Sequence, residues 1–265
     1  MQITEITIPV GADKPFRMLH MSDNHLSLAD ERDNERKNAL AVSRANSFTG
    51  NHPERLLENL TELMEFAKKE NLTILHTGDM IDFVSEANLD YTKKAFAGAD
   101  VFAAAGNHEF SQYVGEAWED EEYKAQSFAH VKEAFPGDFW FQTRVVNGVK
   151  FIAVDNNYYY VTEEQLRLFQ EAVSDGMPAV LIMHNPLYSE DMYRNISENA
   201  TIQSFLNVCL IKLMLLGYLR NNLPVIICKT KLVSKSLPYL SASTSKLTAY
   251  CNNSHSIITF LSLLL

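Results

Sequence analysis

Four short segments of the chain carry side chains that could do chemistry, and each follows an apolar run that reads as a strand. They are Ser-Asp-Asn-His at 22–25, Gly-Asp-Met-Ile-Asp at 78–82, Gly-Asn-His-Glu at 106–109 and His-Asn-Pro at 184–186. Their carboxylate, amide and imidazole groups suit borderline divalent metals such as Mn, Fe, Zn or Co. Two such ions held about 4 Å apart can hydrolyse phosphate esters. The segments therefore predict a two-metal hydrolytic site.

Asp23 and His25 are the first pair of candidate ligands. They stand two residues apart, just after the predicted strand at 16–21. Because an extended segment sends side chains i and i+2 to the same side, both could reach one metal ion. A turn aspartate next to a surface histidine would give the same pattern, so this pair alone is a weak signal.

Two aspartates follow the next predicted strand, at 72–76. Asp79 comes after Gly78, a residue that tolerates unusual backbone angles at a strand end, and its two oxygens could bridge two ions. The alternative is an ordinary Gly-Asp turn. Asp82 could orient a metal ligand, or it could equally cap a helix.

The remaining candidates are Asn107, His108 and His184. Asn107 offers an amide oxygen, which is an ordinary ligand for a hard or borderline metal. His108 is better placed as a general acid for the leaving alkoxide, because imidazole titrates near the working pH. His184 ends a predicted strand at 179–183 and could be a ligand. The alternatives are a solvated loop histidine for His108 and a strand-end histidine with satisfied hydrogen bonds for His184. The other histidines are read as strand-buried (His20, His76) or helix-associated (His52, His130).

Hydrophobic patterning predicts the elements that must position these residues. Strands are expected at 3–10, 16–21, 72–76, 101–104, 139–146, 149–154 and 179–183, and helices at 53–69, 91–97 and 162–173. Asn147-Gly148 favours a type I′ hairpin turn, and the segment 162–165 forms a capping box. Alternating strands and helices with ligands at strand ends indicate a layered α/β fold with its site at one edge. The polar segment 26–51 is expected to form one wall of that site.

Length and charge exclude some function classes. The chain has 265 residues, enough for one large α/β domain, and a net charge of −10. This charge argues against a nucleic-acid groove, which needs a basic stripe, but not against a small phosphate ester, because bound metal ions reverse the local field. No apolar run reaches the roughly 18 residues of a membrane span, and no secretory signal is visible. A cytoplasmic protein is therefore expected, and no protein partner can be inferred.

The composition changes sharply near residue 192. Of the 33 Asp and Glu residues only Glu198 lies beyond it, whereas seven of the 23 Lys and Arg residues do. The net charge is therefore −16 over 1–192 and +6 over 193–265, and all three cysteines lie in the second part. We expect a core at 1–192 and a divergent tail at 193–265, for example a frameshift or read-through product.

Taken in their order along the chain, the four polar segments resemble those of the calcineurin-like metallophosphoesterases, and the resemblance covers about residues 14–190. Gly-Asn-His-Glu at 106–109 is the most specific match, and Gly78-Asp79 and Asp23-x-His25 support it. The resemblance implies a double β-sheet sandwich flanked by helices. It also implies five metal ligands. Asp23 and His25 would bind one ion, Asn107 and His184 would bind the other, and Asp79 would bind both.

The chain departs from this family at its C-terminal end. The family normally adds a later Gly-His-x-His, with one histidine for each metal, but the only histidine after His184 is His255. The expected fold is therefore incomplete at the C-terminus, with each ion lacking one ligand and the tail packing poorly on the core.

The leading interpretation is a divalent-metal-dependent hydrolase of small phosphate mono- or diesters. Two ions, Mn, Fe or Zn, would activate a water molecule, and His108 and Asp82 would belong to the catalytic machinery. One alternative is a non-catalytic or poorly folded relative that binds at most one ion. Another is a metal-binding interaction module with a basic tail.

Overall fold

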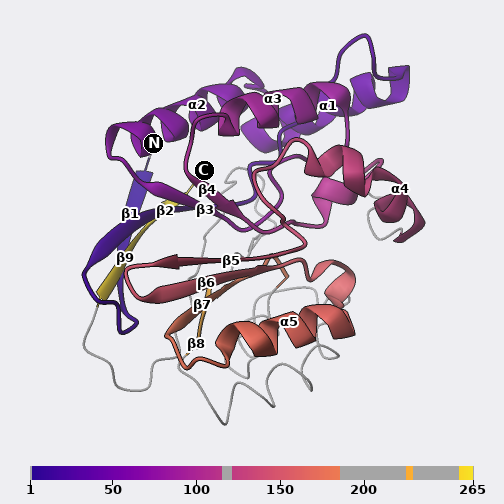
Figure 1. The fold of residues 1–265 in the computed structure, drawn as a ribbon. Coiled ribbons are helices and arrows are strands. Elements are labelled where there is room, and N and C mark those ends of the chain that lie inside the picture. Colours follow the sequence, from indigo (N-terminus) through magenta and orange to yellow (C-terminus); the bar gives the residue numbers. More distant parts are fainter. Residues whose placement is uncertain (1, 115–120, 186–224, 229–256, 265) are drawn as a thin grey trace, which may run out of the picture.

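The computed structural model describes residues 2–114, 121–185, 225–228 and 257–264, whose strands form two sheets (Figure 1). The five-stranded sheet has the order β1 (Gln2–Pro9), β9 (Ile257–Leu264), β2 (Phe16–Met21), β3 (Thr73–His76) and β4 (Val101–Ala103). The four-stranded sheet has the order β5 (Phe141–Val146), β6 (Val149–Val154), β7 (Ala179–Ile182) and β8 (Val225–Cys228). All neighbouring strands pair in parallel except β1 with β9 and β5 with β6.

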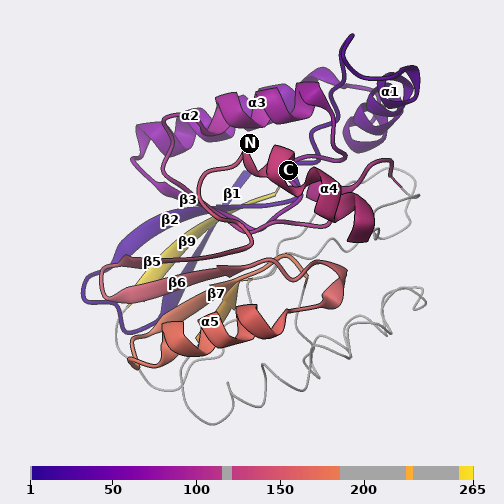
Figure 2. The same ribbon diagram turned by 45° about the vertical axis from the view of Figure 1, so that its right-hand side comes forward.

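Helices cover the outer faces of both sheets (Figure 2). The helices α2 (Glu54–Lys69) and α3 (Glu86–Phe96) lie over the five-stranded sheet, with α1 (Glu35–Thr49) beside them, and α5 (Glu163–Val173) covers the other sheet. The helix α4 (Glu121–Lys132) lies beside the short 3-10 helix η1 (His108–Phe110), and a second one, η2 (Asn157–Tyr159), follows β6. The predicted α/β class is confirmed. Among the residues that the structure describes, no helix has the length and hydropathy of a membrane span.

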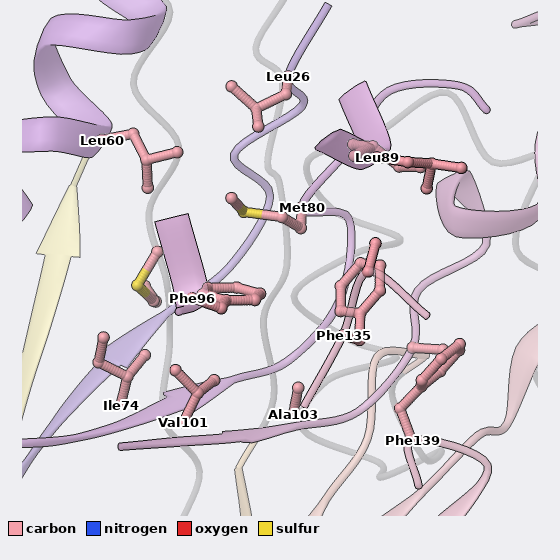
Figure 3. Packing of buried hydrophobic residues seen from close by; sticks show 14 of the residues in the cluster. Leu26, Leu60, Ile74, Met80, Leu89, Phe96, Val101, Ala103, Phe135 and Phe139 are labelled. Atoms are coloured by element: carbon pink, nitrogen blue, oxygen red, sulfur yellow. The ribbon is translucent and has the colours of Figure 1, made fainter. Parts of the chain in front are cut away.

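Residues of β2, β3, β4, β6 and β7 alternate between two buried cores, which is why these strands read as largely apolar runs. Between the sheets, Met18 and Phe102 pack in one cluster with Phe151. On the opposite face of the five-stranded sheet, Ile74 packs with Leu60 and other side chains of α2 and α3, as Figure 3 shows. With both faces buried, the strand ends are held rigidly.

The structure places the predicted elements within about two residues, with one exception. The helix α3 begins at Glu86 rather than 91, because the Ser85 side chain accepts a hydrogen bond from the Asn88 backbone and caps it. The predicted hairpin turn is present, with positive φ at Asn147 and Gly148. The helices α1 and α4 were not predicted; α1 lies within the segment expected as a wall of the site.

Two segments of the C-terminal tail lie within the sheets. Strand β9 pairs with β1 on one side and β2 on the other, and β8 pairs with β7. The backbone of these two segments thus pairs with strands of the core, while the expected division into a core at 1–192 and a divergent tail at 193–265 stays a prediction. The eight residues of β9 carry no charge and are mostly apolar, so they suit a central strand. Most of the tail, His255 included, lies outside the described residues.

Candidate metal centre

The four polar segments meet where strands of both sheets end. Asp23, Asp79 and Asn107 follow β2, β3 and β4 of one sheet, and His184 follows β7 of the other. The sheets are joined here by a hydrogen bond of 2.9 Å between His184 Nδ1 and the Thr77 carbonyl oxygen. This contact leaves Nε2 as the nitrogen of His184 that faces the other candidates.

Three of the predicted ligands, Asp23, His25 and Asp79, each bring a ligand atom within 4.8 Å of the others, and His184 contacts the same Asp79 carboxylate. The Nε2 atom of His25 lies 3.8 Å from Asp23 Oδ1 and 3.7 Å from Asp79 Oδ2. The Nε2 atom of His184 lies 3.2 Å from the same Asp79 oxygen. Donors bonded to one ion at about 2.0–2.2 Å stand about 3.0–3.5 Å apart, so this donor set fits a divalent metal after small adjustments. Asp79 lies between the two histidines, which suits a carboxylate shared by two ions.

Asn107 belongs to the loop that packs against Asp79. The next backbone N–H, that of His108, donates a hydrogen bond of 3.0 Å to Asp79 Oδ1. The Asn107 side chain begins η1 without making a capping hydrogen bond to it. Its backbone is therefore beside the other candidates, and its amide is not committed to the helix.

Left-handed backbone, not extended backbone, brings the ligands together. Asp23, His25 and Asp79 have φ of 54°, 47° and 57°, values that are uncommon for residues other than glycine. The expected extended conformation at Asp23 and His25 is therefore wrong, although their side chains do meet. Such angles persist only where the surroundings enforce them, as in functional sites. A Cβ on Gly78 would lie 2.5 Å from Gly106 N, and one on Gly106 would lie 2.2 Å from Asp79 Oδ1, so both glycines are required.

Asp82 lies behind two histidines instead of capping a helix. It is fully buried, and its Oδ1 is 2.9 Å from His25 Nδ1. Its backbone carbonyl oxygen is 2.6 Å from His108 Nδ1. Its carboxylate also pairs with Arg44, with an Oδ2 to Nε distance of 2.6 Å. Of the two roles open for Asp82, the structure favours orientation of the imidazoles, since Ser85 caps the following helix.

The charges in the site balance one another. Burial acts to lower the pKa of His25, but Asp23 and Asp82 raise it to about 10. Burial acts in the same sense at His184, where Asp79 raises the pKa to about 10. The pKa of Asp79 is held well below its usual range by the neighbouring imidazoles, against the effect of burial. Carboxylates placed in this way require positive charge, from protons or from a metal cation.

Glu109 is a residue of the motif to which the sequence pattern gave no role. It is fully buried and accepts four backbone hydrogen bonds, from the N–H groups of Asp79, Met80, Ile81 and Gly106. The carboxylate therefore holds together the two loops that carry candidate ligands. The only sequence signal was its place directly after the histidine of Gly-Asn-His-Glu.

Comparison with known proteins agrees with this geometry. The family model described as calcineurin-like phosphoesterase matches residues 16–217, more than half of the chain. The predicted resemblance is thus confirmed, and the match continues past the expected end near residue 190. No curated protein matches the chain. With the loops that carry the candidate ligands and glycines inside the matched region, the chain belongs to the calcineurin-like phosphoesterase family.

Proposed function

We propose that this protein hydrolyses small phosphate esters with the help of two divalent metal ions. Membership of the family supports metal-dependent phosphoester hydrolysis in general. The observation that carries the proposal is the approach of His25 Nε2 and His184 Nε2 to Asp79 Oδ2, at 3.7 and 3.2 Å. A shared carboxylate between two imidazoles is an arrangement suited to two neighbouring cations.

In this proposal the donors divide between the two ions. Asp23 and His25 hold the first ion, Asn107 and His184 hold the second, and Asp79 contributes to both. When bound, the two ions (Mn, Fe or Zn) would lower the pKa of a water molecule. Their positive charge would also stabilise the phosphoryl oxygens. The layers of helix, sheet, sheet and helix support the double-sheet sandwich that such a site requires.

His108 is the proposed proton donor to the leaving oxygen. Its Nδ1 contacts the Asp82 carbonyl oxygen at 2.6 Å, so Nε2 is the nitrogen available to the substrate. Its side chain is 16% exposed, whereas that of Asp82 is completely buried. Asp82 therefore acts by orienting His25 and His108 and does not contact the substrate.

The proposed substrates are small mono- or diesters. The net charge of −10 gives no basic groove for a nucleic acid, whereas two bound cations would attract a small anionic ester locally.

The test combines metal content with turnover. The purified chain is analysed for bound metal and assayed with aryl phosphate mono- and diesters in the presence of Mn²⁺. Asp79→Asn and His184→Gln should abolish turnover and lower metal content, while Glu164→Gln on the surface of α5 should change neither. The sequence lacks a late Gly-His-x-His, so one ion or fewer per chain without turnover would favour a non-catalytic relative.

A further inference from the structure

One face of α1 is directed toward the candidate metal centre. Ala41 and Ala45 are buried, and Arg44 and Phe48 lie on the same stripe of the helix, three or four residues apart. The helix is fixed at both ends, by the Asn34 side chain at its start and by a left-handed Gly50 at its end. The stripe is therefore held in place against the loops that carry the candidate ligands.

Arg44 and Phe48 complete a closed ring of contacts around His25. The Phe48 ring stacks on the His25 ring, with centroids 4.8 Å apart and an interplanar angle of 18°. The Arg44 guanidinium lies 4.6 Å from the centroid of Phe48 and forms two hydrogen bonds with Asp82, of 2.6 and 3.0 Å. Asp82 Oδ1 returns to His25 Nδ1 at 2.9 Å.

This ring leaves the His25 imidazole little freedom. Phe48 covers one face of the imidazole, Asp82 holds Nδ1, and His108 meets the ring edge-to-face at 4.6 Å. Only Nε2 is directed at the carboxylates of Asp23 and Asp79. Arg44 touches both Phe48 and Asp82, so it supports the imidazole through two contacts at once.

We propose that Arg44 and Phe48 of α1 are positioning residues that hold the His25 imidazole with Nε2 directed at the metal centre. The proposal rests on the proposed function for the role of His25 as a ligand. The helix α1, which the sequence patterns did not predict, thereby influences the metal affinity of the site. A bidentate guanidinium that also stacks on an aromatic ring has no equivalent in lysine, so the two basic residues are not interchangeable here.

The test compares Arg44→Met, Arg44→Lys and Phe48→Leu with the wild type and with Arg55→Met, which removes an exposed arginine from α2. Calorimetric titration with Mn²⁺ should show affinity about 10–100-fold lower for Arg44→Met and Phe48→Leu, as is typical when the support of a ligand is lost. Arg44→Lys should recover only part of the loss, and Arg55→Met should bind like the wild type.

A second measurement on the metal-free chain separates positioning from stability. The imidazole nitrogen resonances of His25, assigned with a His25→Gln variant, should shift or broaden in Arg44→Met and Phe48→Leu but not in Arg55→Met. Unchanged resonances and Mn²⁺ affinity, with only a lower urea midpoint, would mean that Arg44 merely stabilises α1 and would overturn the proposal. If the wild type binds no Mn²⁺, the proposed function fails, while the resonances still decide whether α1 orients His25.

Discussion

At the scale of single residues, His108 and Glu109 show how adjacent positions divide the work of the site. His108 is partly exposed beside the candidate ligands, whereas Glu109 is completely buried beneath them. The His108 side chain is accessible to a bound substrate, whereas the Glu109 side chain contacts only other residues of the protein. Their substitutions should therefore have different signatures.

Replacement of the candidate acid should depend on the leaving group. In His108→Ala, hydrolysis of alkyl phosphates should fall by about 10²–10⁴-fold, because their leaving oxygens need a proton, and hydrolysis of nitrophenyl phosphates should fall much less. Steady-state rates for both substrates measure the difference. Equal losses would show that His108 does not donate the proton.

Glu109→Gln should weaken the connection between the two ligand loops. Oε1 accepts hydrogen bonds from Met80 and Ile81, and Oε2 accepts from Asp79 and Gly106. A glutamine amide replaces one acceptor by a donor, so two buried N–H groups lose their partner. The expected cost is about 1–3 kcal/mol of unfolding free energy for each N–H group, measured by urea denaturation.

The control for this variant is Glu133→Gln, at an exposed carboxylate near the end of α4. It should leave the urea midpoint unchanged. If Glu109→Gln were as stable as this control and bound Mn²⁺ as well as the wild type, the carboxylate would not be holding the loops.

At the scale of elements, the strands β2 and β3 each bury a histidine that must stay neutral. Burial lowers the pKa of His20 to about 4 and that of His76 to about 3. In His76 the Nδ1 atom accepts a hydrogen bond of 3.1 Å from the Gly78 N–H, and Nε2 lies 2.9 Å from Asn24 Oδ1. Protonation would remove that acceptor directly beneath the loop of Asp79.

These histidines should make the fold sensitive to mild acid. Both have lower pKa values in the folded chain than the ordinary 6.5 of the unfolded one, so the unfolded chain binds more protons below pH 6.5. Their contribution is present above pH 6.5 and is lost as the pH falls toward 4. Each histidine should lower the free energy of unfolding by about 1.4 kcal/mol for every pH unit below about pH 6.

Urea denaturation at pH 5.0, 6.0 and 7.0 measures this slope. The slope should be smaller in His76→Gln and unchanged in His130→Gln, which alters an exposed histidine of α4. His25 and His184 have raised pKa values, so their stabilisation is complete below pH 6.5 and does not contribute to the slope there. Burial raises the pKa of Glu109 from 4.5 to about 7, so this group opposes the slope of one histidine in that range, and the net wild-type slope is about that of the other. A wild-type stability that is flat over this range would contradict the prediction.

At the scale of the whole molecule, the last described strand connects the two ends of the chain. Strand β9 lies between β1 and β2, with Leu261 paired to Glu5 on one side and to Leu19 on the other. Without β9, β1 would lose its only partner among the described strands. The tail segment at 257–264 is thus part of the sheet that carries Asp23 and Asp79.

Leu261→Pro should therefore destabilise the whole domain. Proline removes a backbone donor in the middle of a sheet and leaves its acceptor unpaired, at a cost of about 1–3 kcal/mol, whereas Leu261→Val keeps the donor and the preference for strands. Urea denaturation should show a clearly lower midpoint for the proline variant only. Equal midpoints for the two variants would mean that β9 contributes little to the fold.

The sequence by itself determined the local units and the family. An apolar run predicted the strand 16–21, helical spacing predicted the helix 53–69, and the order of the polar segments predicted the family. These features are encoded by neighbouring residues, through side-chain alternation, capping and turn preferences. They are enough to identify Asp23, Asp79 and His184 as candidate ligands.

Only the tertiary structure decided how those units meet. The support of His25 by α1, the clamp formed by Glu109 and the insertion of β9 between β1 and β2 all join segments far apart along the chain. The left-handed angles at Asp23 and Asp79 are likewise imposed by surrounding contacts and not by local preference. Such contacts depend on which surfaces pack best in the complete fold, and a local sequence pattern does not contain that information.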